Sequence, residues 1–203
     1  MHRGTCLLAL AALLAAGCAA RGNGAAEPEV ETCRIRSEVE LGNGFTIQLP
    51  DVESFDNVEQ TEHCLGDQPG IEHFRRHVGC EENHADAAVF YSVVPAVGGS
   101  CLPPLMREWN DLRDLPDWLG CESLHVGPLT GIGSAPDSVS RFDFSHDCLC
   151  PQGLPQVGRA VSRPAGLPGQ CLMAAGFWPR SQDRTMSLAF ERAVGCVTVS
   201  VTD

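Results

Sequence analysis

The chain has 203 residues and a formal net charge of −12, from 26 acidic side chains and 14 basic ones, all of which are arginine. Such an acidic surface repels phosphate backbones, and nucleic-acid-binding proteins carry clustered basic residues instead, so we expect no nucleic-acid partner. The absence of lysine excludes a lysine nucleophile, a Schiff base and the lysine of a phosphate-binding loop. The length suits a single domain.

The start of the chain has the pattern of an export signal that ends on a cysteine. His2 and Arg3 give a short positive start, residues 6–16 form an apolar run, and small residues precede Cys18. The run is too short for a transmembrane helix, which needs about 20 apolar residues. The segment resembles bacterial lipoprotein signals, which implies that Cys18 is lipidated. By the same resemblance, Ala19 after the cysteine implies sorting to the outer membrane.

Residues 19–31 contain Gly, Ala, Pro and acidic residues without apolar periodicity, a composition typical of a flexible tether. We therefore divide the chain into a signal peptide over residues 1–18, a tether over residues 19–31 and one domain over residues 32–203. A plain secretory signal is the alternative, because Cys18-Ala19-Ala20 also offers the small residues that cleavage requires.

The first part of the domain predicts two strands and one helix. Apolar residues alternate over residues 44–49, which predicts a strand. They recur at helical spacing over residues 70–78, which predicts a short helix. The nearly continuous apolar run over residues 87–94 predicts a central strand that is buried on both faces.

A longer helix follows. Pro103 and Pro104 suit its first turn, Leu105, Trp109 and Leu112 recur at helical spacing, and a later proline breaks the pattern. We expect this helix to pack its Leu/Trp face on the sheet.

The second half of the domain is rich in predicted strands. Residues 126–132 and 138–145 predict strands, and residues 157–163 and 171–178 predict the two sides of a hairpin. A helix that Ser181 or Asp183 caps and Gly195 closes is predicted next, followed by a last strand over residues 196–201. The expected fold class is therefore α+β: an antiparallel sheet with packed helices.

Cysteines are spread through the whole domain, which is typical of disulfide-bonded proteins in oxidising compartments. If Cys18 carries lipid, the nine cysteines of the domain form an odd set, and one of them is free or pairs with another molecule. Spacing favours local pairs: Cys64 with Cys80, Cys101 with Cys121, and Cys148 or Cys150 with Cys171. The disulfide candidates are Cys33, Cys64, Cys80, Cys101, Cys121, Cys148, Cys150, Cys171 and Cys196.

Three segments carry a resemblance to a known class of domains: GFTIQLP near the start, AAVFYSVVP after it, and CLMAAGFW followed by the last helix. In this order they resemble the PsbP-like and DcrB-like domains of envelope and thylakoid-lumen proteins. The resemblance implies helices stacked on an antiparallel sheet and a non-catalytic role in the envelope or in assembly.

Sequence signatures of common enzymes are absent. The chain has no Gly-x-Ser-x-Gly elbow, Walker loop, His-Glu-x-x-His motif or EF-hand loop. Asp143 with Asp147 has the spacing of a carboxylate pair, but a solvated acidic surface explains the pair equally well. Cys148 and Cys150 lack the spacing of a thioredoxin-type site, so two structural disulfides are the expected state. We expect no enzymatic activity.

Four of the seven histidines fall between residues 63 and 84. His73 and His77 lie four residues apart, so on the predicted helix they share a face and can bind one metal ion. The alternative is an exposed polar helix whose flanking Cys64 and Cys80 form a disulfide. The candidate ligands for Zn²⁺ or Cu²⁺ are His63, His73, His77, Glu81 and His84.

These observations predict a lipoprotein of the bacterial cell envelope, anchored to the membrane through Cys18 and acting as a binding or assembly module. Its expected partner is another envelope protein. The alternative function is metal binding or metal sensing through the histidines of residues 63–84.

Overall fold

The computed structural model describes residues 33–62, 65–76, 85–114, 124–132, 139–146 and 155–202, which belong to one unit, Cys33–Asp203. Its helical elements are η1 (Leu65–Asp67), α1 (Leu102–Asp114), η2 (Arg180–Gln182) and α2 (Asp183–Cys196). Its strands are β1 (Ile35–Leu41), β2 (Phe45–Pro50), β3 (Asn57–Thr61), β4 (Gly70–Arg76), β5 (Ala85–Pro95), β6 (Leu124–Val126), β7 (Thr130–Ile132), β8 (Val139–His146), β9 (Gln156–Pro164), β10 (Gln170–Pro179) and β11 (Thr198–Val201).

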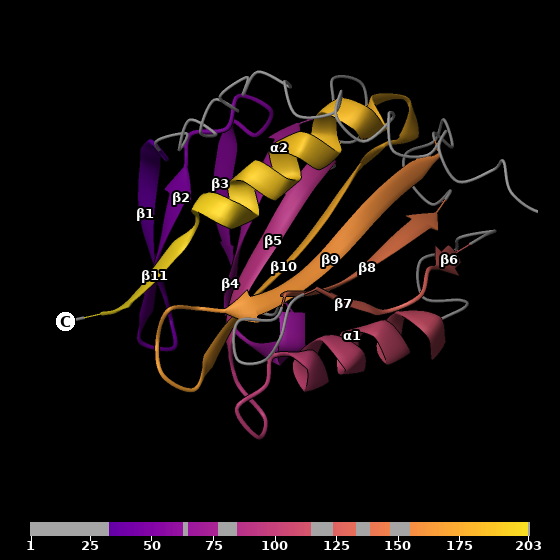
Figure 1. Ribbon diagram of the computed structural model, residues 1–203. Coiled ribbons are helices and arrows are strands. Elements are labelled where there is room, and N and C mark those ends of the chain that lie inside the picture. The colour runs from indigo at the N-terminus through magenta and orange to yellow at the C-terminus, as the bar shows by residue number, and fades with distance from the viewer. Residues whose placement is uncertain are drawn as a thin grey trace, which may run out of the picture. The chain divides into compact units, whose positions relative to one another are not determined.

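The described strands form two antiparallel sheets. The larger sheet has the order β3-β4-β5-β10-β9-β8-β6, with β7 also paired to β8. The smaller sheet has the order β1-β2-β11. Figure 1 shows α2 and α1 on opposite sides of the larger sheet. The smaller sheet lies at the left of the view, next to β3 and β4. The α+β class and the antiparallel pairing are therefore confirmed.

Two apolar cores fill the two sides of the larger sheet. The first core contains Met186 and Phe190 of α2, Ile47 of β2, and Val89 and Tyr91 of β5, so α2 and the smaller sheet share one side. Phe190 reaches the sheet where β10 carries Gly176, because a Cβ atom there would lie 2.7 Å from the Phe190 ring. The second core lies under α1.

The helix α1 begins where the sequence predicts and packs as expected. Its first backbone N–H, that of Leu102, donates to the Ser100 Oγ at 3.2 Å, which satisfies one of the free donors of the first turn. Leu105 is fully buried, and the half-buried Trp109 donates its indole N–H to the Gly127 carbonyl at 2.9 Å. The Leu/Trp face of the helix therefore contacts the sheet, as predicted.

The predicted helix over residues 70–78 is wrong, since residues 70–76 form β4 between β3 and β5. Ile71 faces the α2 side of the sheet and Phe74 the opposite side, and both are buried. A strand buried on both faces loses the alternation that normally marks it, and its apolar spacing then imitates a helix. The sequence does not predict strands β1 and β3, because polar and charged residues interrupt the alternation of apolar residues in both.

Two disulfides join described cysteines, Cys33 to Cys196 and Cys101 to Cys171. The predicted pairs of Cys101 with Cys121 and of Cys171 with Cys148 or Cys150 are therefore wrong. Because β10 returns antiparallel beside β5, Cys171 lies opposite Val94, close to the loop that leads to Cys101. Cys64, Cys80, Cys121, Cys148 and Cys150 lie outside the described residues.

The start of the α2 helix also differs in detail from the prediction. The N-cap residue is Gln182, and its side chain makes no capping hydrogen bond. Asp183 is the first helical residue, and its carboxylate accepts the Trp178 indole N–H at 2.9 Å. Neither α1 nor α2, the α-helices of the described ranges, has the length and apolar character needed to cross a membrane.

Candidate binding pocket

His73 is the predicted metal ligand that lies within the described residues. It lies on β4, is fully buried, and its Nε2 atom lies 2.9 Å from the Phe55 carbonyl oxygen. Burial lowers the pKa of His73, against the opposing effect of that hydrogen bond. His73 lies on an extended strand, so the predicted helix that would carry it is wrong.

The other predicted metal ligands, His63, His77, Glu81 and His84, lie outside the described residues, as does the predicted lipidation site Cys18. Within the described ranges, no three His, Cys, Asp or Glu side chains are arranged to hold a metal ion. A metal site formed by the outlying residues stays a prediction. The fold places His73 in the core, where its imidazole is already hydrogen-bonded.

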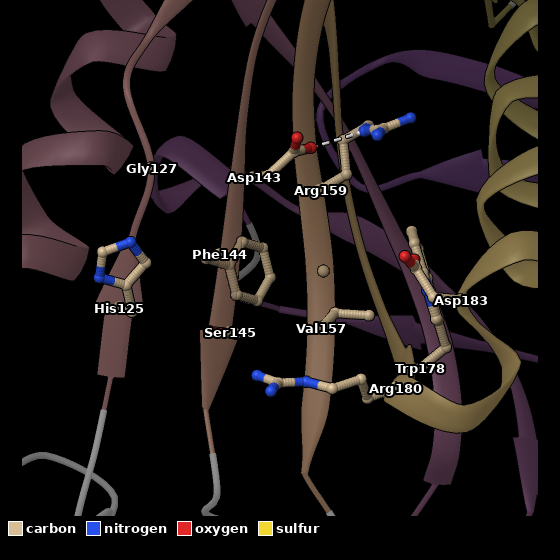
Figure 2. Close-up of a pocket in the computed structure, with 11 residues that line it drawn as sticks. His125, Gly127, Asp143, Phe144, Ser145, Val157, Arg159, Trp178, Arg180 and Asp183 are labelled. Atoms are coloured by element: carbon tan, nitrogen blue, oxygen red, sulfur yellow. Dashed lines mark hydrogen bonds and ion pairs between the residues drawn. The ribbon is translucent and has the colours of Figure 1, made fainter.

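A pocket of about 330 Å³ opens on the α2 side of the larger sheet, near the start of α2 (Figure 2). We call it the β8–β9 pocket. Four strands, η2 and the first residue of α2 contribute its functional side chains, and Phe144 and Gly158 also line it. Its polar and aromatic lining side chains are His125, Asp143, Ser145, Arg159, Trp178, Arg180 and Asp183.

Strand register explains why these residues meet. Ser145 of β8 lies opposite Val157 of β9, which in turn lies opposite Trp178 of β10. On the other side of β8, His125 of β6 lies opposite Ser145. Directly opposite residues in a sheet share a face, so all four side chains belong to the α2 side.

Arg159 is the positive centre of one wall. Its Nε donates to the Asp143 carboxylate at 2.7 Å and its Nη1 donates to Glu191 of α2. Burial opposes the charge of this guanidinium, but the Asp143 hydrogen bond and the nearby carboxylates hold its pKa above the usual value. Arg159 is therefore neutralised within the protein, and it ties α2 to the sheet.

Three other polar side chains at the pocket are not held by hydrogen bonds or ion pairs of this kind. Arg180, His125 and Ser145 form no hydrogen bond or ion pair through their side chains with any described residue. The backbone N–H of Arg180 donates to the Pro155 carbonyl at 2.9 Å, which fixes where its side chain begins. Figure 2 shows this side chain extending across β9 toward Ser145.

Ser145, His125 and Asp143 are the residue types of a hydrolase triad, and all three line the pocket. A triad requires a hydrogen bond from the serine to the histidine and another from the histidine to the acid. Here the Asp143 carboxylate binds Arg159, and neither of the required bonds is present among the described side chains. These three side chains therefore do not form the hydrogen-bonded arrangement of a triad in this structure.

The sequence did not reveal this pocket. His125 is an isolated histidine in the sequence, Asp143 stands out only for its spacing from Asp147, and Arg180 and Ser145 carry no motif. The alternation over residues 138–145 does place Asp143 and Ser145 on one face of a strand. The pairing of β8 with both β6 and β9, which brings His125 and Arg159 beside them, is a long-range feature.

No protein-family model matches the sequence, and no curated protein matches it significantly. Several solved structures are similar in arrangement. LpqN of Mycobacterium tuberculosis, described as involved in cell envelope biogenesis, aligns with a TM-score of 0.49 and 12% identity, over 81% of this chain and 90% of LpqN.

Two further solved structures are comparable. The PsbP protein CyanoP of Synechocystis sp. PCC 6803 has a TM-score of 0.47 and 6% identity, over 85% of this chain and 96% of its own. The Ran-binding protein Mog1p of Saccharomyces cerevisiae has a TM-score of 0.44 and 14% identity, over 85% and 97%. At these TM-scores and identities, the roles of the three proteins are not transferred to this chain. Its membership of the PsbP-like class stays a prediction.

Proposed function

We propose that this chain is a non-catalytic binding module of the bacterial cell envelope, and that the β8–β9 pocket binds the anionic group of a small ligand or of a peptide end. The observation that carries the proposal is Arg180, a cation at the pocket that no described carboxylate neutralises. In a chain with a net charge of −12, such a guanidinium stands out against an acidic surface.

The chemistry of the free donors supports an anion. A guanidinium presents several N–H donors in one plane and binds carboxylate or phosphate oxygens in pairs. The Ser145 hydroxyl and an N–H of the His125 imidazole supply further donors from the neighbouring strands. Arg159 is less suited to this role, because the Asp143 and Glu191 carboxylates already neutralise its charge and accept from its Nε and Nη1.

The pocket volume limits the ligand. At about 330 Å³ it lies at the lower end of the range of small-molecule sites. It suits a carboxylate or phosphate group with a short apolar part, which the half-buried Val157 side chain can contact. A peptide C-terminus and a small free anion share this chemistry.

The binding test uses isothermal titration of the purified protein with three probes: a short peptide with a free C-terminus, the same peptide amidated, and inorganic phosphate. Arg180→Gln should weaken binding of the preferred probe by roughly tenfold or more. The control is Arg184→Gln, an exposed arginine of α2 that does not line the pocket. Equal affinities in both variants, or no binding of any probe, would overturn the proposal.

The non-catalytic part of the proposal has its own test. The protein is incubated with a panel of activated esters and amides, beside its Ser145→Ala variant. We expect equal and uncatalysed rates for both proteins. A turnover that disappears in Ser145→Ala would instead show that the pocket is a hydrolase site.

The envelope location rests on the signal-like residues 1–18 and agrees with the two described disulfides, which are typical of exported proteins. A labelled fatty acid should enter the wild-type chain expressed in a bacterium, and Cys18→Ala should abolish the label and release the protein from membranes. Mature protein that starts at unmodified Ala19 or Arg21 would contradict the anchor and leave the pocket proposal intact.

A further inference from the structure

The last strand, β11, is an open edge of the smaller sheet. It pairs with β2 on one side, and no other described strand pairs with it. In Figure 1 it runs from the end of α2 to the C-terminus beside β1 and β2. An open strand edge presents unpaired backbone groups that can pair with another chain.

The hydrogen-bond pattern shows which groups are free. The Thr202 N–H donates to the Gly44 carbonyl at 3.0 Å, just beyond the paired residues Val201 and Phe45. Because bonded and non-bonded pairs alternate in an antiparallel ladder, Ser200 also bonds toward β2, whereas Val199 and Val201 direct their N–H and C=O groups outward. No hydrogen bond within the described ranges takes up these outward groups.

The sequence of this edge is a palindrome. Residues 198–202 read Thr-Val-Ser-Val-Thr, symmetric about Ser200. If two copies pair antiparallel about a two-fold axis at Ser200, each residue meets its own type: Val199 meets Val201 of the other copy, and Thr198 meets Thr202. The outward groups of Val199 and Val201 then face each other as hydrogen-bonded pairs.

The edge also lacks the features that block pairing at other edges. β1 carries Arg36, Glu38 and Glu40, and β3 carries Glu59, whereas β11 has no charged residue and no proline. Charged residues on an edge strand prevent pairing between molecules. The Val201 side chain is 62% exposed, although the half-buried Val199 on the same face packs against the core.

We propose that two copies of this chain associate through β11, antiparallel and two-fold symmetric about Ser200, so that the two three-stranded sheets become one continuous sheet. The pairing buries Val201 against Val199 of the other copy and satisfies the free backbone groups. Five residues per strand make a small interface, so the dimer is weak, with a dissociation constant on the order of micromolar or higher. Added salt strengthens it, because it screens the repulsion between two acidic chains.

Cysteine crosslinking tests the symmetry directly. Ser200→Cys places two thiols across the axis at a non-hydrogen-bonded pair, where Cβ atoms approach closely enough for a disulfide. Thr198→Cys is the matched control, because in this register Thr198 faces Thr202 and lies far from its own copy. We expect a covalent dimer on a non-reducing gel for Ser200→Cys and at least fivefold less for Thr198→Cys. Equal crosslinking, or none, would overturn the proposal.

Sedimentation of the purified full chain over a range of concentrations provides the second measurement. Val201→Lys should raise the dissociation constant at least tenfold, whereas Leu188→Lys should leave it unchanged. Leu188 is a matched control, since this residue of α2 is 63% exposed and lies away from the edge. A dimer that Val201→Lys does not weaken would assign the association to another surface and refute pairing through β11.

Discussion

The Nε2–H of His73 donates to the Phe55 carbonyl oxygen at 2.9 Å, in a contact that also brings the two rings to a centroid distance of 5.3 Å. Arg36 donates to the same carbonyl at 3.2 Å. The other imidazole nitrogen, Nδ1, is buried and has no hydrogen-bond partner among the described residues. A second proton on this ring would therefore place a charge in the core, close to a guanidinium.

This arrangement makes stability depend on pH. Burial, opposed by the Phe55 hydrogen bond, holds the pKa of His73 below its ordinary value of about 6.5. Above that value neither state binds the proton. As the pH falls below about 6.5, the unfolded chain takes up a proton that the fold resists, and the free energy of unfolding falls by up to about 1.4 kcal/mol per pH unit.

Urea unfolding between pH 8 and pH 4.5 measures this slope. His73→Gln keeps an N–H donor for Phe55 but does not titrate, so the variant should lose part of the slope. His125→Gln, at an exposed histidine, should keep it. A His73→Gln variant with the same pH dependence as the wild type would contradict the assignment.

The two described disulfides should each stabilise the domain. Cys33–Cys196 joins residues 163 apart in sequence, and Cys101–Cys171 joins residues 70 apart. Replacing either pair by alanine should lower the free energy of unfolding by about 2–4 kcal/mol, because the unfolded chain gains freedom. Peptide mapping without reductant should recover both linkages. A peptide that links Cys101 to Cys121 would contradict this fold.

Gly176 should tolerate no side chain. A Cβ atom there would lie 2.7 Å from the Phe190 ring and 3.1 Å from the Ala88 carbonyl oxygen, so α2 would have to move from the sheet. Gly176→Ala should therefore cost about 1–3 kcal/mol in thermal or denaturant unfolding. Gly131→Ala, on β7 with nothing within 4 Å of the added atom, is the control and should cost far less. Similar losses in both variants would argue against close packing of α2.

Two substitutions of Asp183 should separate the contribution of its hydrogen bond with Trp178 from the contribution of its negative charge. Asp183→Ala leaves the indole N–H of the buried Trp178 without its acceptor and should destabilise the domain by about 1–3 kcal/mol. Asp183→Asn retains an acceptor and loses only a negative charge at the start of α2, which is worth about 0.3–1 kcal/mol. Chemical denaturation compares the two, and equal losses would show that the charge, which both variants remove, accounts for the whole effect.

The sequence by itself determined the elements whose residues pack in a local pattern. The β5 run is apolar on both faces, α1 and α2 repeat apolar residues every three to four positions, and the β9–β10 hairpin alternates around a glycine-rich turn. These patterns reflect short-range geometry, because a helix or strand with one buried face fixes which positions are apolar. They were sufficient to predict the α+β class.

Only the tertiary structure decided β4, the disulfides and the pocket. Ile71 and Phe74 form a strand because β3 and β5 pair on either side of them. Cys101 meets Cys171 because β10 returns beside β5. In the same way, the β8–β9 pocket exists because β8 lies between β6 and β9, which places His125 beside Ser145. Each of these depends on residues far apart in the chain, and backbone pairing between strands leaves no local mark on the sequence.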